Sequence, residues 1–376
     1  RLNASVREAD TVARLGGDEF TIVMGSLDRA RSVERVASDI LERFCQPFQL
    51  GEETAFVSTS IGITLYPDDA TEADEMLKNA DQAMYAAKDH GRNCYQYFTS
   101  SMQRLAVSRG LLVRDLRSAL PGNQFHLCYQ PIVEMTTGRI YKAEALLRWQ
   151  HPTRGMVSPG EFIPVAEETR MIVDIGDWVF REAVRQCLRW REAFNPTFQI
   201  TINTSPVQYR SEDFDVPAWT RHLGEMGLSG QAVAVEITEG LLMDSASKVT
   251  DKLLIFRDAG IQVSLDDFGT GYSSLSYLKK FDIDYLKIDR AFVQNLAVDS
   301  DDMALCEAII VMAHKLGLKV IGEGIETEAQ RDLLSAAGCD YGQGYFFARP
   351  LTAEGLDDLL SQRDVTSGPA SHELSA

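Results

Sequence analysis

The sequence predicts an α/β protein, a (β/α)8 TIM-type barrel with one antiparallel strand, preceded by a truncated α+β domain. From about residue 125, apolar strand-like runs alternate with amphipathic helical stretches over about 240 residues, the pattern and length of a closed barrel. The first two of these runs are joined by only Thr136-Thr137-Gly138. A connection this short cannot hold a crossover helix, so the two strands must pair as an antiparallel hairpin.

Composition and charge bound the function. The 376 residues are 45% hydrophobic and 24% charged, which is ordinary for a globular protein, and the formal net charge is −18. So acidic a chain is a poor binder of duplex nucleic acid. Six cysteines without a C-x-x-C pair indicate reduced thiols rather than a zinc site.

No signal peptide or apolar run of the ~20 residues that span a bilayer is visible. We expect a cytoplasmic protein. Because the chain opens with Arg1 inside what reads as a domain, we expect a fragment whose parent is membrane-anchored or carries sensors in a preceding region.

The first hundred residues predict a small α+β domain. Two apolar runs flank Gly16-Gly17, which indicates a hairpin. A helix is predicted over 30–44, a strand over 55–65, a helix over 72–89 that Gly91 ends, and a strand over 95–98. Residues 100–117 have helical composition and are read as an interdomain connector, or equally as the first helix of the second domain.

The second domain supplies the barrel elements. The predicted strands cover 126–133, 141–149, 198–205, 232–239, 262–269, 284–289, 319–324 and 340–345. The predicted helices between them include 173–193, 247–259, 302–316 and 328–336. The polar tail predicts disorder. The domain boundaries expected from these patterns are 1–99, 100–117, 118–363 and 364–376.

Acidic and amide side chains, with one lysine, recur at or near the C-terminal ends of the predicted strands: Glu144, Asn203, Glu236, Glu239, Asp266, Asp267, Lys287, Asp289, Glu323, Glu326 and Gln343. In a closed barrel these ends converge on one mouth, where barrel enzymes place their chemistry. A single strand-end acid is usually a turn former or a helix cap, but capping does not explain strand after strand. Divalent cations would relieve the repulsion, and oxygen donors favour Mg²⁺ or Mn²⁺.

Two adjacent acids, Asp266 and Asp267, suggest a site with two ions about 3.5–4 Å apart, which is suited to phosphoryl displacement. Residues 268–274, which follow, contain two glycines. This stretch is either a mobile loop over the mouth or an ordinary turn in which Ser273 caps the next helix.

The second domain resembles the EAL-domain cyclic di-GMP phosphodiesterases. The match rests on an ordered series of motifs: Gln130-Pro131-Ile132, Glu144-Ala145-Leu146 with Arg148, Asn203-Thr204-Ser205, Glu236-Ile237-Thr238-Glu239, the run from Asp266 to Leu275, Lys287-Ile288-Asp289, Glu323-Gly324-Ile325-Glu326 and Gln343-Gly344-Tyr345. Three letters alone recur by chance, but this order covers the domain nearly end to end.

The resemblance implies two Mg²⁺ or Mn²⁺ ions held by Glu144, Asn203, Glu236, Asp266, Asp267, Glu323 and Gln343, with Asp266 bridging the ions. It implies a catalytic group that consists of Glu144, Lys287, Glu323, Asp266 and Asp267, in which Lys287 orients the attacking water and contacts the phosphate. Supporting roles fall to Gln130 and Arg148, which would contact the dinucleotide, to Glu239, which would anchor the glycine-rich loop, and to Glu326.

The first segment resembles the C-terminal part of a GGDEF diguanylate cyclase domain. The signature is Gly16-Gly17-Asp18-Glu19-Phe20, and Arg7 and Asp10 match an R-x-x-D inhibitory site that suits guanine and phosphate recognition. The family's first half, with its metal-binding Asp, has no counterpart here. We therefore expect a regulatory segment that is not cyclase-competent, and that binds GTP or cyclic di-GMP only in an intact parent.

The expected activity is hydrolysis of cyclic di-GMP to linear pGpG, and the resemblance implies a homodimer through the barrel. Two alternatives stay open at this stage. One is a non-catalytic cyclic di-GMP receptor, which the complete ligand set disfavours. The other is an unrelated metal-dependent barrel enzyme, which the motif series disfavours.

Overall fold

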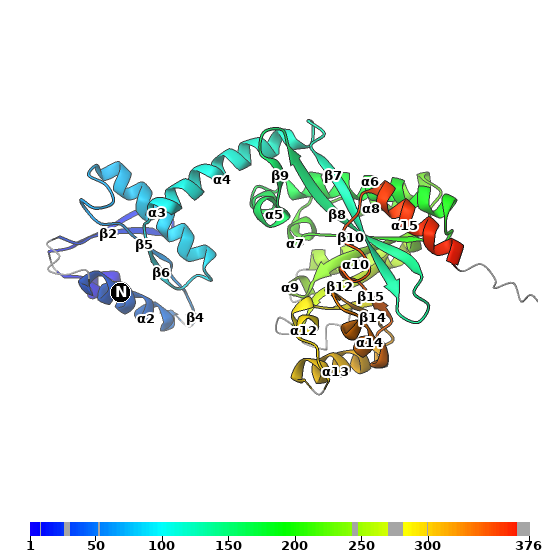
Figure 1. The fold of residues 1–376 in the computed structure, drawn as a ribbon. Coiled ribbons are helices and arrows are strands. Elements are labelled where there is room, and N and C mark those ends of the chain that lie inside the picture. The colour runs from blue at the N-terminus through cyan, green and yellow to red at the C-terminus, as the bar shows by residue number, and fades with distance from the viewer. Residues whose placement is uncertain are drawn as a thin grey trace, which may run out of the picture. The chain divides into compact units, whose positions relative to one another are not determined.

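The computed structural model describes residues 1–7, 9–25, 31–51, 53–242, 247–269, 281–298 and 300–366. The chain divides into two compact units, Arg1–Leu112 and Val113–Ala376. In Figure 1 the first unit runs from blue to cyan, and the second from cyan to red.

The first unit is the small α+β domain. After α1 (Leu2–Ser5), strands β1 (Thr11–Gly16) and β2 (Glu19–Val23) pair antiparallel across the Gly-Gly turn, as predicted. The turn needs glycine because Gly17 has φ of 53°, in the left-handed region. Helix α2 (Arg31–Cys45) buries Val33 and Ala37 on one face, at helical spacing.

The remaining strands of this unit correct one prediction. A single strand over 55–65 was wrong: β4 (Glu53–Ala55) closes a short hairpin with β3 (Phe48–Leu50), and β5 (Ile61–Ile63) pairs parallel with β6 (Tyr95–Tyr97). Helix α3 (Ala73–Asp89) packs closely on β5, because a Cβ added to Gly62 would lie 1.9 Å from the backbone oxygen of Ala80. The prediction failed because an apolar run does not reveal that its two ends pair with different strands.

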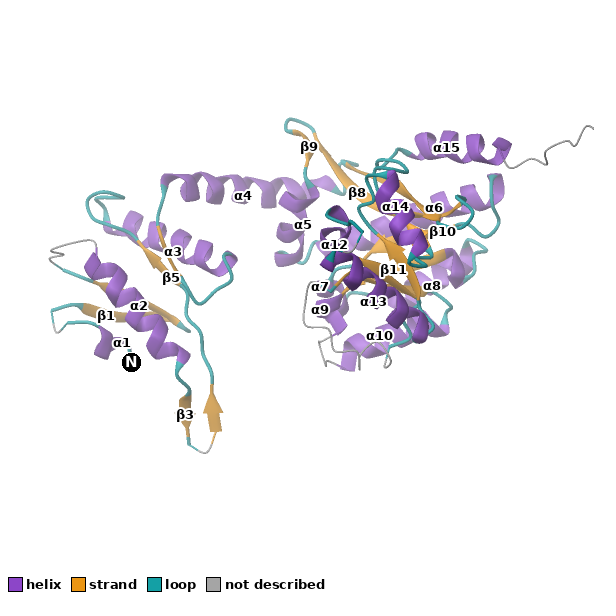
Figure 2. Ribbon diagram, turned by 60° about the horizontal axis from the view of Figure 1, so that its bottom comes forward, coloured by secondary structure: helices purple, strands orange, loops and turns teal. Residues whose placement is uncertain are grey.

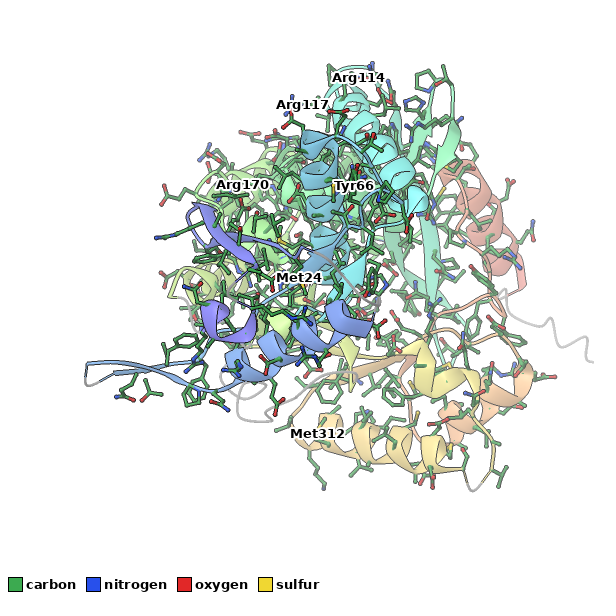
Figure 3. The ribbon with its side chains drawn as sticks, turned by 90° about the vertical axis from the view of Figure 1, so that its left-hand side faces the viewer. Met24, Tyr66, Arg114, Arg117, Arg170 and Met312 are labelled. Carbon is green, nitrogen blue, oxygen red and sulfur yellow. The ribbon has the colours of Figure 1, made fainter. Side chains whose placement is uncertain are left out.

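Helix α4 (Ser100–Ala119) passes from one unit into the other. Its second half is amphipathic: Leu116 and Ala119 are buried, whereas Arg114 and Arg117 are exposed and project outward (Figure 3). The predicted connector and the predicted first helix of the second domain are therefore parts of one helix.

The second unit is the predicted barrel with one reversed strand. Its strands are β7 (Phe125–Glu134), β8 (Ile140–His151), β10 (Gln199–Asn203), β11 (Val233–Thr238), β12 (Gln262–Phe268), β13 (Tyr285–Ile288), β14 (Lys319–Gly322) and β15 (Tyr341–Gly342). They run in sequence from β10 to β15, then β7 and β8, and a β8–β10 pairing closes the barrel. Strand β7 is the reversed one, antiparallel to both β8 and β15. The unpredicted β9 (Gly155–Val157) extends β8 outside the barrel.

Helices surround the strands (Figure 2). They are α5 (Pro159–Glu168), α6 (Ile172–Ala193), α7 (Pro206–Arg210), α8 (Val216–Glu225), η1 (Gly230–Ala232), α9 (Glu239–Leu242), α10 (Ser247–Asp258), α12 (Arg290–Gln294), α13 (Asp301–Lys315), α14 (Glu328–Ala336) and α15 (Ala353–Thr366). Helices were predicted at α6, α10, α13 and α14, but not at α5, α7, α8, α9, α12 or α15. Among the described residues no helix is both long and apolar enough to cross a membrane.

Aromatic side chains hold the outer helices to one another. Phe180 of α6 stacks on Trp219 of α8, with 4.0 Å between ring centroids and 8° between planes. At the C-terminus, Trp190 of α6 donates to Oδ1 of Asp357 in α15 at 2.6 Å. Helix α15 continues to Thr366, beyond the predicted end of the barrel at residue 363. The rest of the predicted disordered tail, 367–376, lies outside the described residues.

Inside the barrel, side chains form layers because residues two apart in a strand face the same side. Glu144 therefore lies above Lys142 in β8, and Lys287 above Tyr285 in β13. The ammonium of Lys142 lies 3.3 Å from the centroid of the Tyr285 ring. This packing fills the N-terminal end of the barrel and leaves the carboxylates at the C-terminal end.

Candidate active site

Strand register brings the predicted acids and amides together. Asn203 of β10 is the register partner of Glu236 of β11, and Asp266 of β12 is the partner of Thr238 at the end of β11. On the reversed strand, Gln130 is the partner of Glu144. Residues that lie far apart in the sequence thus meet at the C-terminal mouth of the barrel.

Lys287 is the centre of this cluster. Its Nζ lies 2.5 Å from Oε1 of Glu323, 2.8 Å from Oε2 of Glu236, 3.5 Å from Oδ1 of Asp266 and 3.7 Å from Oε2 of Glu144. The side chain is only 1% exposed. Burial opposes the charged form, but these carboxylates hold the pKa of Lys287 well above its usual range. The carboxylates around this buried lysine therefore favour its charged form.

One ammonium does not neutralise the carboxylates around it. Burial, and next the charge of Glu144, raise the pKa of Glu236 well above its usual range. Burial also raises the pKa of Glu323 to about 7, although the charge of Lys287 works against it. The site holds more negative charge than its own lysine can balance, which is a setting that favours a bound cation.

Glu144 is the exception, because it is held ionised. Asn203 Nδ2 donates to its Oε1 at 2.5 Å, and Gln343 Nε2 donates to its Oε2 at 2.6 Å. Burial would raise the pKa of Glu144, but Lys287 and these two hydrogen bonds outweigh burial and lower it. Both amide side chains thus fix the carboxylate and keep their own oxygens available.

A break in the regular pleat accompanies Asp267. Consecutive residues of a regular strand point to opposite faces, so Asp266 and Asp267 would be separated. Strand β12 instead has a register shift between Leu265 and Phe268, and Asp267 has φ of 55°. Its backbone N–H donates to Oδ1 of Asp266 at 3.0 Å. Burial and the charges of Asp266 and Asp289 raise the pKa of Asp267, so the bulge brings it into the same electrostatic site.

The remaining predicted residues lie at the edge of the cluster or outside it. Glu239 begins α9 and is buried with neither carboxylate oxygen hydrogen-bonded to a described residue, and the loop it is expected to anchor falls mainly in 270–280, outside the described residues. Glu326 is exposed, and its backbone N–H donates to Oε1 of Gln330. Arg148 is half-buried on β8, and its Nη1 donates to the backbone oxygen of Leu147.

Residues of the first unit form a separate feature. The signature Gly16-Gly17-Asp18-Glu19-Phe20 makes the β1–β2 turn, in which Arg14 Nε donates to the backbone oxygen of Gly17 at 2.8 Å. Arg7 and Asp10 lie together just before β1, with the Arg7 N–H donating to Oδ2 of Asp10 at 2.9 Å.

No role was predicted for Thr204, which lies beside the cluster. Its Oγ1 donates to the backbone oxygen of Glu236 at 2.6 Å, and its N–H donates to the same oxygen at 3.0 Å. The hydroxyl also lies 3.1 Å from that of buried Tyr209. Thr204 therefore ties the ends of β10 and β11 together. The capping box of Ser205 and Gln208 was the available signal, since it marks where β10 gives way to α7.

The donor set fits a hard divalent cation. Carboxylate and amide oxygens converge at the mouth, and Oε1 of Glu236 and Oε1 of Gln343 are buried without a hydrogen-bond donor among the described residues. Within the described part of the chain, no three acidic, histidine or cysteine side chains are arranged to hold a metal ion. The Lys287 ammonium lies among the carboxylates instead. Metal binding would therefore require the Lys287 ammonium to move away from some of the carboxylates that it now contacts.

Comparison with known proteins places this site in a family. The profile described as "EAL domain" matches residues 113–350, and the profile described as "Diguanylate cyclase, GGDEF domain" matches residues 1–94. The bifunctional diguanylate cyclase/cyclic di-GMP phosphodiesterase MucR of Pseudomonas aeruginosa is 42% identical over 95% of this chain and 52% of its own length. The cyclic di-GMP phosphodiesterase NbdA of the same organism is 35% identical over 100% of this chain and 48% of its own.

These relatives are longer proteins, and the chain spans about half their length. A solved structure of the MucR phosphodiesterase in complex with c-di-GMP matches with a TM-score of 0.62 at 42% identity. That match covers 65% of this chain and 99% of the other, so it concerns the barrel unit.

Proposed function

We propose that this chain, which belongs to the EAL domain family, is a metal-dependent phosphodiesterase that hydrolyses cyclic di-GMP to linear pGpG in bacterial second-messenger signalling. The observation that carries the proposal is the buried cluster of Glu144, Glu236, Asp266 and Glu323 around Lys287 at the barrel mouth. The similarity to MucR and NbdA, whose names state cyclic di-GMP phosphodiesterase activity, supports the substrate.

Two Mg²⁺ or Mn²⁺ ions would be held by oxygen atoms of Glu144, Asn203, Glu236, Asp266, Asp267, Glu323 and Gln343. Bound ions of this kind supply hydroxide near neutral pH by lowering the pKa of a water. Lys287 would contact the phosphate and orient the attacking water. Because its ammonium stays protonated, it can donate hydrogen bonds and balance charge that develops on phosphate oxygens.

We propose Arg148 and Gln130 as contacts for the dinucleotide, Glu239 as an anchor for the loop after β12, and Glu326 as a support of the site. The guanidinium of Arg148 suits a phosphate or a guanine edge, because it can donate two parallel hydrogen bonds.

The first unit would regulate the barrel, with Arg7 and Asp10 as a candidate inhibitory site for a guanine nucleotide. The proposed domain limits remain 1–99, 100–117, 118–363 and 364–376. All six cysteines are free, which suits a reducing cytoplasmic compartment.

A homodimer through the barrel is also proposed. Helix α13 presents exposed apolar side chains on its outer face, among them Leu305 and Val311, the latter 57% exposed. Sedimentation of the chain at micromolar concentration would show a single monomeric species if this part of the proposal is wrong.

The function is tested by incubating the purified chain with cyclic di-GMP and Mg²⁺ or Mn²⁺ and separating the products by chromatography. We expect pGpG, no product with chelator, and a fall of several orders of magnitude in turnover for Glu144→Ala. Glu328→Ala is the matched control, since Glu328 is exposed and paired only at the surface with Arg331. Tight binding of cyclic di-GMP with no product after long incubation with Mn²⁺ would instead identify a receptor.

A further inference from the structure

We propose that Gln130 is a positioning residue, which sets the orientation of the Gln343 amide so that Gln343 Oε1 faces the cation site. The inference rests on the proposed function, because it concerns the same metal site. It assigns Gln130 a role in addition to the proposed contact with the dinucleotide.

Both ends of the Gln130 amide are hydrogen-bonded inside the protein. Its Nε2 donates to the backbone oxygen of Ala348 at 3.1 Å, and its Oε1 accepts from Gln343 Nε2 at 3.2 Å. Gln130 is buried on β7, whose reversed direction makes it the register partner of Glu144. These two hydrogen bonds fix which end of the Gln130 amide faces Ala348 and which faces Gln343.

The orientation passes along the chain of hydrogen bonds in one direction. A backbone carbonyl only accepts, so the oxygen of Ala348 requires the NH₂ end of Gln130 to face it. The oxygen end of Gln130 then faces Gln343 and requires an NH₂ group there. Gln343 Nε2 meets this demand and donates in addition to Glu144 Oε2 at 2.6 Å.

The consequence lies at the other end of the Gln343 amide. Its Oε1 is buried and accepts no hydrogen bond from any described residue, although the residue is only 4% exposed. A buried carbonyl oxygen without a partner is costly unless something else compensates it. A hard divalent cation compensates it directly, since amide oxygens are among its preferred ligands. Loss of Gln130 would leave the Gln343 NH₂ group held by Glu144 Oε2 alone, so the Gln343 amide would be less firmly oriented toward the cation.

The test measures metal binding without substrate. Gln130→Met keeps the length and apolar stem of the side chain but removes both hydrogen bonds. We expect Mn²⁺ affinity, read from the free-Mn²⁺ EPR signal, to fall about 10- to 100-fold, the usual effect of losing a residue that orients a metal ligand. Raising Mn²⁺ from limiting to saturating concentration should raise the kcat of Gln130→Met by a larger factor than that of the parent. Gln150→Met, at an exposed position on the neighbouring strand β8, should change neither quantity.

A double-mutant cycle separates the effect that Gln130 has through Gln343 from general damage to the fold. If Gln130 acts through Gln343, then Gln343→Met alone and the double variant should lose similar Mn²⁺ affinity, well short of the sum of the single losses. Thermal melting of each variant checks folding. Unchanged Mn²⁺ affinity with a raised KM in Gln130→Met would overturn the inference in favour of substrate contact, and additive losses would also overturn it. If the parent binds Mn²⁺ but makes no pGpG, the proposed function fails, while the positioning role of Gln130 stands. No Mn²⁺ binding by the parent would overturn both.

Discussion

Replacing Lys287 by Met should destabilise the metal-free protein. Met has a similar length and no charge, so the change leaves Glu144, Glu236, Asp266 and Glu323 facing one another with no cation among them. Removing one partner of a buried ion pair costs roughly 3–5 kcal/mol, because the remaining charge is left uncompensated. A domain of this size shifts its Tm by about 2–4 °C per kcal/mol, so we expect a fall of roughly 6–20 °C.

The assay is thermal unfolding at pH 8 with chelator, followed by the same measurement with Mn²⁺. The divalent cation should raise the Tm of Lys287→Met more than that of the parent, since it no longer competes with the ammonium. The difference from the parent should shrink at pH 5. Burial raises the pKa values of Glu236 and Glu323 in the folded state, so protonation of these two carboxylates favours folding.

Lys319→Met is the matched control. Lys319 also pairs with a carboxylate, Asp340, at 2.7 Å, but its side chain is 59% exposed. An exposed pair contributes about 0–1 kcal/mol, so the control should melt within a few degrees of the parent. If Lys287→Met melts as the control does, or if Mn²⁺ adds no more to its Tm than to that of the parent, the carboxylates are not balanced by Lys287.

Three further changes test other parts of the structure. Asp340→Asn should lower stability at pH 6 but not at pH 2. Burial raises the pKa of Asp340, but hydrogen bonds, led by the one from Lys319, lower it overall. The stability that ionised Asp340 contributes is therefore present above pH about 3.8 and is lost as the pH falls through the lower pKa of the folded state. Urea unfolding midpoints at pH 6 and pH 2 measure this contribution. Thr204→Val should lower stability by about 1 kcal/mol in urea unfolding through loss of the hydroxyl bond to the Glu236 carbonyl, and Thr204→Ser should restore it; equal midpoints for all three chains would contradict the assignment. Trp219→Ala removes the buried ring stacked on Phe180 and should cost about 3–5 kcal/mol by the same assay, with a loss under ~1 kcal/mol speaking against the packing described.

Much of the barrel followed from local pattern. Apolar runs marked the strands that carry Glu144 and Lys287, and amphipathic runs marked α6 and α14, whose start and end were predicted to within one residue. The short Thr136-Thr137-Gly138 connection was enough to predict a reversed strand, because chain length limits which pairings a loop allows. Helices α5 and α8 escaped prediction, since both are short and begin near a proline, where local signals also fit a turn.

The order of strands and the acids at their ends were therefore properties of the sequence by itself. Closure of the barrel decided the rest. Only closure places the Lys287 ammonium among carboxylates from four other strand ends, and only the antiparallel register of β7 sets Gln130 against Glu144 and Gln343. Local pattern tells which face of a strand a side chain occupies, whereas donor and acceptor partners depend on atoms tens to hundreds of residues away. Hydrogen-bond direction and charge balance are therefore properties of the folded site.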